Sequence, residues 1–88
     1  MIIERSASFK KSYKKRIAKD KRLVTRVSER IRIFQNNPLH PLLRNHALTG
    51  VRYGQRAFWI TGDIRIIYYP INDNHVLFID IGSHNQVY

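Results

Sequence analysis

The N-terminal third of the chain places apolar residues at helical spacing among basic ones. A first helix is indicated by three apolar residues that recur every four positions: Phe9, Tyr13 and Ile17. Ser6 or Ser8 can cap it. A second helix is expected between Asp20, which can cap it, and residues 36–38, where Pro38 disfavours helical backbone before it. Its apolar stripe consists of Leu23, Val27, Ile31 and Phe34.

The C-terminal half changes to the period of two that is typical of strands. Three runs rich in β-branched and aromatic residues are expected as strands: residues 56–61, 64–69 and 76–81. The links at residues 61–63 and 70–74 are short, so these strands form antiparallel hairpins. Ile2 and Ile3 begin a further short run suited to a strand, and residues 38–55 are expected as a loop with a turn at Thr49-Gly50.

These elements predict an α+β fold in which an N-terminal helical hairpin packs on a small antiparallel sheet of three to four strands. A chain of 88 residues allows one domain, so residues 1–88 are expected to form it. The chain has no cysteine, which excludes disulfides and thiolate chemistry. It has neither an apolar run of the roughly 18 residues that span a bilayer nor a signal-peptide pattern. We therefore expect a cytoplasmic protein with no membrane partner.

Positive charge is concentrated at the N-terminal end. Sixteen Lys and Arg against six Asp and Glu give a net charge of +10, and residues 1–32 hold twelve of these basic residues and three of the acidic ones. Such a surface attracts polyanions, so a nucleic acid or an acidic protein is the expected partner. The alternative is an ordinary solvated face. The residues expected to bind RNA are Lys10, Lys11, Lys14, Lys15, Arg22, Arg26 and Arg56.

Three motifs in the second half carry a resemblance to a known family. Residues 45–50 read NHALTG, residues 62–68 read GDIRIIY and residues 81–88 read IGSHNQVY. They resemble, in this order, the HxLxG loop, the GDxRxxY hairpin and the terminal IGxHxxxY motif of the RelE/ParE superfamily of bacterial toxins. The likeness is greatest to the YafQ and RelE/StbE branch, and the expected order of helices and strands also matches that superfamily.

The resemblance implies a toxin of a type II toxin–antitoxin system. It further implies an endoribonuclease that cleaves mRNA on the ribosome and is neutralised by a cognate acidic antitoxin. RNA cleavage without a metal needs a base for the 2′-hydroxyl, an acid for the leaving 5′-oxygen and cations beside the phosphate. Histidine suits the first two roles and arginine the third. The sequence offers no convincing cluster of metal ligands, so we expect neither a metal nor another cofactor.

The motif positions identify five candidate catalytic residues: His46, His84, Arg65, Asp63 and Tyr88. The two histidines are expected to share the acid and base roles. Arg65, together with Arg56, is expected to hold the phosphate, and Tyr88 to orient the substrate. Asp63 lies in a tight turn, where aspartate often binds its own backbone, and its alternative role is acid–base chemistry or the orientation of a histidine.

Two residues depart from the family pattern. Trp59 stands where YafQ-type toxins carry another histidine, and Asp80 stands where many RelE members carry an arginine. Loss of that cation weakens transition-state stabilisation unless Arg52 or Arg56 replaces it, although Asp80 also fits the DIGxH ending of the RelE/StbE branch. Two alternatives therefore stay open: a ParE-like toxin that poisons gyrase, and a basic RNA-binding domain without catalysis.

Overall fold

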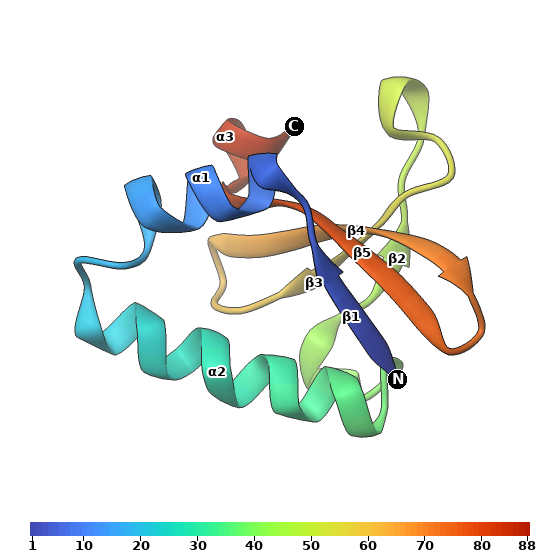
Figure 1. Ribbon diagram of the computed structural model, residues 1–88, viewed down its shortest axis with the longest axis horizontal. Helices are drawn as coiled ribbons and strands as arrows, with labels where there is room; N and C mark the ends of the chain where they lie inside the picture. Colours follow the sequence, from blue (N-terminus) through green and yellow to red (C-terminus); the bar gives the residue numbers. More distant parts are fainter.

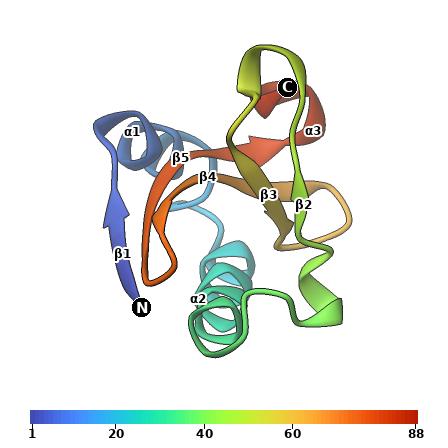
Figure 2. The same cartoon turned by 90° about the vertical axis from the view of Figure 1, so that its right-hand side faces the viewer.

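The computed structural model describes residues 1–88 and contains a single five-stranded sheet with the strand order β1-β5-β4-β3-β2 (Figures 1 and 2). The antiparallel meander consists of β3 (Arg56–Trp59), β4 (Ile64–Asn72) and β5 (His75–Ser83). At the edges, β1 (Ile2–Arg5) pairs in parallel with β5, and β2 (His46–Ala47) pairs antiparallel with β3. The α+β class and the meander are confirmed, but the expectation of three to four antiparallel strands was wrong, because the sheet has five strands and is mixed.

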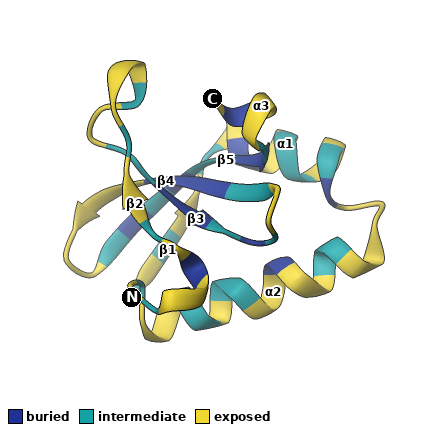
Figure 3. Ribbon diagram, turned by 180° about the vertical axis from the view of Figure 1, so that it is seen from behind, coloured by how far each residue is buried: buried dark blue, intermediate teal, exposed yellow.

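The differences from the expected sheet lie at its edges. The helical segment that follows β1 carries the chain back across the sheet, so β1 joins β5 in parallel. The strand β2 lies inside residues 38–55, and two residues are too few to show a period of two. The strand β4 continues through Pro70, because β3 begins opposite Tyr68 and leaves this end of β4 on an exposed edge (Figure 3).

Two long helices cover one face of the sheet. These are α1 (Ala7–Arg16) and α2 (Lys21–Asn36), and their caps are as predicted: the Ser6 hydroxyl accepts from the Phe9 N–H, and the Asp20 carboxylate from the Arg22 and Leu23 N–H groups. The helices splay apart instead of packing as a close hairpin (Figure 1). The expected hairpin is therefore correct only in its order. No helix has the length and apolar character needed to cross a membrane.

The core has a large part under the long helices and a small part on the opposite face. In the large part, the rings of Phe34 and Phe58 stack with their centroids 4.4 Å apart, and Tyr68 and Phe78 surround them. The small part consists of Ala57, Ile67 and Val87. Val87 belongs to a third, C-terminal helix, α3 (His84–Val87), which was not predicted. This helix is thereby fixed to the face of the sheet that α1 and α2 leave open.

A bulge in β5 decides which of its residues face the helices. Asp80 pairs with Ile67, whereas Phe78 pairs with the next residue of β4, so Ile79 is an extra residue. Phe78 and Ile81 therefore both enter the large core, and Ile79 packs on the opposite face. If the period of two continued without the bulge, Asp80 would lie on the face of Phe78, and its carboxylate would be buried among apolar side chains.

Candidate active site

Two of the motifs meet at a hollow of about 390 Å³ on the sheet face opposite to α1 and α2. His46 reaches it from β2, and His84 and Tyr88 reach it from α3. Arg52, from the loop between β2 and β3, lines it as well; this loop lies beside α3 (Figure 2). Residues 46 and 84, which are 38 positions apart in the sequence, are thus brought to one place by the sheet and the last helix.

His84 and Tyr88 are held as a unit at the end of the chain. Their rings contact edge to face with centroids 4.7 Å apart. At the start of α3, the Ser83 N–H donates to Gln86 Oε1 at 2.8 Å, and at its end Arg52 Nε donates to the Val87 carbonyl at 2.7 Å. A four-residue helix is not stable alone, so these contacts fix the position of His84.

His46 has a defined tautomer in its neutral form. Its Nδ1 lies 2.9 Å from the carbonyl oxygen of Arg44. A carbonyl oxygen only accepts, so Nδ1 carries the proton and Nε2 is left with its lone pair. His46 is therefore arranged as a proton acceptor through Nε2.

Arg52 and Asp80 belong to a network beneath the hollow. Asp80 lies 3.3 Å from Arg16 Nη1 and 3.8 Å from Arg52 Nη2, and its side chain is only 16% exposed. Arg52 also donates to Gln55 Oε1 at 2.9 Å, and Arg16 to the Ile81 carbonyl at 3.0 Å. Asp80 therefore ties α1 to the loop of the hollow. Arg52 lines the hollow, but each of its three guanidinium nitrogens already has a partner within the chain.

Arg65 lies on the same sheet face as His46 but outside the hollow. It pairs with Trp59, which is two residues along β3 from Ala57, the partner of His46. The Arg65 guanidinium lies 4.8 Å from the centre of the Trp59 ring, and Arg44 lies 4.5 Å from the same ring. The structure therefore places Arg65 beside the histidines and not between them.

Asp63 and Arg56 do not line the hollow of the histidines. Asp63 is exposed in the turn before β4, where its N–H donates to the Thr61 hydroxyl, and it lines a different hollow with Lys15, Arg16, Ser83 and Gln86. Arg56 faces the helix side of the sheet, where its Nε donates to Asn45 Oδ1 at 2.8 Å. The Asn45 amide in turn donates to the Tyr68 hydroxyl. Arg56 thus takes part in a network on the opposite face.

The other residues expected to bind RNA are exposed on α1 and α2: Lys10, Lys11, Lys14, Lys15, Arg22 and Arg26. Only Arg26 has a carboxylate nearby, Glu29 at 3.7 Å, and that pair is itself exposed. The positive charge of the helical layer is therefore largely unneutralised within the chain.

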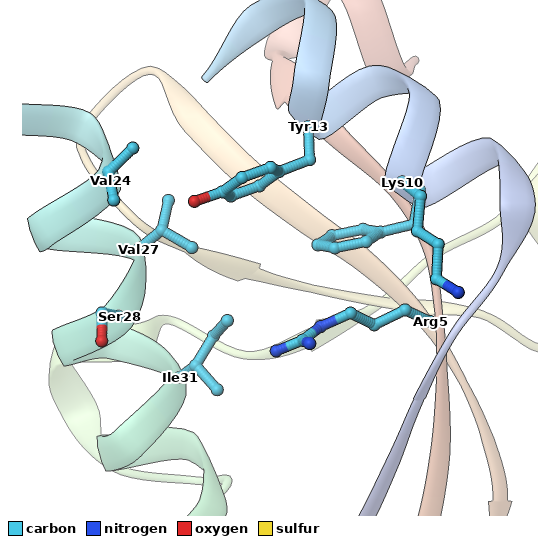
Figure 4. Close-up of a pocket in the computed structure, with 8 residues that line it drawn as sticks. Arg5, Lys10, Tyr13, Val24, Val27, Ser28 and Ile31 are labelled. Carbon is cyan, nitrogen blue, oxygen red and sulfur yellow. The ribbon is translucent and has the colours of Figure 1, made fainter. Parts of the chain in front are cut away.

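A second hollow, which the sequence did not predict, lies between the splayed helices. This groove has a volume of about 490 Å³ and is lined by Phe9, Tyr13, Val24, Val27 and Ile31, with Arg5, Lys10 and Ser28 at its edges. Tyr13 points from α1 toward Val24 and Val27 of α2 (Figure 4). The apolar stripes of the two helices could have indicated this groove, but a stripe in the sequence does not show whether two helices touch each other or stand apart. The groove is therefore suited to bind the apolar surface of a ligand.

The fold is that of the RelE/ParE toxin superfamily. YafQ from E. coli strain BL21(DE3) has a TM-score of 0.80 and 24% identity, over 98% of this chain and 96% of YafQ. A YoeB/ParE toxin from Agrobacterium tumefaciens has a TM-score of 0.77 and 22% identity, over 96% of this chain and 99% of that toxin. The E. coli DinJ–YafQ toxin–antitoxin complex gives a TM-score of 0.75 and 26% identity, over 98% and 94%.

The branch of the superfamily is identified by a family match that covers the whole chain. Residues 1–88 match the family described as "Bacterial toxin of type II toxin-antitoxin system, YafQ". The chain therefore belongs to the YafQ family of type II toxins, as its three motifs indicated. No curated protein matches it.

Proposed function

We propose that this toxin is a ribosome-dependent mRNA endoribonuclease that cleaves RNA by acid–base chemistry without a metal ion. The observation that supports this most directly is that His46 and His84 line one hollow, although they come from opposite ends of the C-terminal half. A proton acceptor and a proton donor on either side of one phosphate are what cleavage by the 2′-hydroxyl requires.

The two histidines take different roles. His46 Nε2 accepts the proton of the 2′-hydroxyl, since its Nδ1 is committed to the Arg44 carbonyl. The 2′-oxygen then forms a bond to phosphorus while the bond from phosphorus to the 5′-oxygen breaks. His84, entering as imidazolium, donates its proton to the departing 5′-oxygen, and Tyr88 holds its ring. The products are a 2′,3′-cyclic phosphate and a 5′-hydroxyl.

The basic side chains bind RNA phosphates and do not take part in the proton transfers. Arg65, on the same sheet face, binds a phosphate of the substrate strand. The exposed lysines of α1 bind ribosomal RNA through its phosphates, an interaction that weakens steeply with salt. The ribosome presents the mRNA to the hollow in the reactive shape.

Primer extension on mRNA tests this function. We expect new 5′ ends when the toxin is added to mRNA on ribosomes, and few or none when it is added to the same mRNA free in solution. Equal cleavage of both would contradict ribosome dependence. No cleavage of either, together with inhibition of DNA supercoiling by gyrase, would replace the proposal with a ParE-like function.

The proposed protein partner is an acidic antitoxin that docks in the groove between α1 and α2. One similar structure is a complex of YafQ with DinJ, a toxin–antitoxin pair. The groove has an apolar floor, and Arg5 and Lys10 lie at its edge (Figure 4). An amphipathic helix with apolar residues on one side and carboxylates beside them fits both features.

The substitution Val24→Asp is expected to weaken antitoxin binding roughly tenfold or more, because it places a carboxylate in the apolar groove facing an acidic partner. Thr25→Asp is the matched control, since it adds the same charge at the next position of α2, outside the groove. Calorimetric titration with the cognate acidic antitoxin measures both. Equal affinities of the two folded variants would place the antitoxin elsewhere.

A further inference from the structure

We infer that Arg44, Trp59 and Arg65 form a clamp for the phosphates of the RNA strand next to the cleavage hollow. The inference rests on the proposed function for the nature of its ligand, but it concerns binding and not cleavage. It gives Arg44 and Trp59 roles that no motif suggested, and it makes Trp59 a positioning residue for two cations.

The clamp is built across three neighbouring parts of the sheet. Trp59 lies on β3, Arg65 on the adjacent strand β4, and Arg44 just before β2 on the other side of β3. The two guanidinium carbons lie 4.5 Å and 4.8 Å from the centre of the indole ring. The electron-rich face of the indole attracts both cations and so offsets their mutual repulsion. Trp59 thus holds two positive groups, each within 5 Å of the centre of its ring.

Both arginines keep donors free for a ligand. Arg44 makes no side-chain hydrogen bond and no ion pair. Arg65 makes one long hydrogen bond, of 3.4 Å, from Nη2 to the Gly62 carbonyl, and its Nη1 makes none. Its Nε is buried without a partner, so the donors open to a ligand are those of the terminal nitrogens. No carboxylate of the chain pairs with either of them. Planar guanidinium groups with unused donors and uncompensated charge are suited to phosphate oxygens.

The backbone of Arg44 supports a functional reason for its position. Its φ is 47° and its ψ is 42°, a left-handed conformation that glycine and asparagine adopt more easily than arginine. Arg44 is the only residue other than glycine with a positive φ in the chain. A strained backbone that carries a long cationic side chain onto an aromatic ring is the kind of feature that marks a binding site.

The clamp continues the cleavage hollow along the same sheet face. Trp59 is two residues from the partner of His46, which corresponds to about 7 Å along a strand. A separate hollow of about 370 Å³ lies at the clamp itself, where Arg26 and Arg30 of α2 line it together with Arg44 and Trp59. Cations therefore follow a path from the histidines toward α2. A chain of regularly spaced phosphates fits such a path, which is why RNA is favoured here over an acidic peptide.

The test measures binding to an RNA that cannot be cleaved. The probe is a labelled single-stranded 2′-O-methyl oligoribonucleotide, and its affinity for the full chain is followed by fluorescence anisotropy over a range of salt concentrations. Arg44→Asn removes the guanidinium and keeps a residue suited to the left-handed backbone, so the fold is preserved. Arg32→Gln, an exposed arginine of α2 outside these contacts, is the matched control for charge.

We expect Arg44→Asn to raise the Kd roughly tenfold. The slope of log affinity against log salt is expected to become shallower by about one, as for the loss of one phosphate contact. Arg65→Gln is expected to act in the same way, and Arg32→Gln to change neither quantity by more than about twofold. Trp59→Leu is expected to weaken binding while leaving the slope closer to the parent value, because both cations remain but are no longer held. Trp59→Phe, which keeps a ring, is expected to rescue binding.

Several results would overturn the inference. They are parent-like affinity and salt slope for Arg44→Asn and Arg65→Gln, parent-like affinity for Trp59→Leu, and an effect of Arg32→Gln as large as that of Arg44→Asn. Weaker binding of the cognate antitoxin with unchanged RNA binding would also overturn it, because the cluster would then be a protein contact. If the clamp variants behave as expected but mRNA on ribosomes is not cleaved, the clamp stands and the proposed function fails.

Discussion

Replacement of His84 by alanine is expected to slow cleavage of mRNA on ribosomes by a factor of roughly 10²–10⁴, the usual contribution of a general acid or base. The leaving 5′-oxygen then departs without a proton from the protein. His84 is exposed at the start of α3, where its ring contacts the exposed Tyr88 edge to face, so its loss does not open the core. The rate of appearance of new mRNA 5′ ends measures the effect.

Two comparisons separate chemistry from folding. Asn85→Ala changes the next exposed residue of the same helix and is expected to cleave at the parent rate. The double variant His46→Ala, His84→Ala is expected to be little slower than either single variant, because the acid and the base act in the same step. Cleavage by His84→Ala at the rate of Asn85→Ala would rule out the acid–base role of His84.

The second large effect is expected in stability. Asp80→Ala is expected to lower the free energy of unfolding by about 2–3 kcal/mol, because it leaves Arg16 and Arg52 partly buried with no carboxylate. Their side chains are each 23% exposed, so water compensates for only part of the loss. The carboxylate also accepts from the Ile81 N–H at 2.9 Å. Unfolding by urea, followed by circular dichroism, measures the change.

Asp73→Ala is the matched control for Asp80→Ala. Asp73 is exposed in the turn between β4 and β5 and pairs with no cation, so its removal is expected to change stability by less than about 0.5 kcal/mol. Asp80→Arg, which introduces the cation that many RelE members carry there, is expected to destabilise the fold further, since it brings a third guanidinium to Arg16 and Arg52. Equal stability of the Asp73 and Asp80 variants would show that the network around Asp80 does not stabilise the fold.

Asp80 therefore has a structural role that its place in the family pattern does not suggest. It is not simply a missing catalytic cation, because its carboxylate joins α1 to the loop that carries Arg52. The bulge at Ile79 is what turns Asp80 away from the large core. A single extra residue in a strand has no signature in hydrophobic periodicity, so the orientation of Asp80 could not be predicted.

The positions of the arginines of the site were likewise only partly predictable from the sequence. The motif that contains Arg65 placed it correctly on a strand, but the register of three strands decides that it lies over Trp59 and outside the hollow of the histidines. Arg52 reaches that hollow from a loop with no regular pattern. Arg56 was expected to help bind phosphate, and strand parity turns it to the opposite face. Each outcome depends on pairings between residues that are distant in sequence.

The sequence alone determined the helices with their caps, the antiparallel meander, the excess of positive charge, the toxin family and the two histidines of the hollow. Each of these depends on local spacing, on composition or on short motifs, which are visible in one dimension. The tertiary structure decided the parallel edge strand, the splay of α1 and α2 and the groove between them. It also decided the orientation of Asp80 and the cluster of Arg44, Arg65 and Trp59. Those features arise from strand register and from the faces that elements present to one another, and a shift of one residue reverses a face without changing any local pattern.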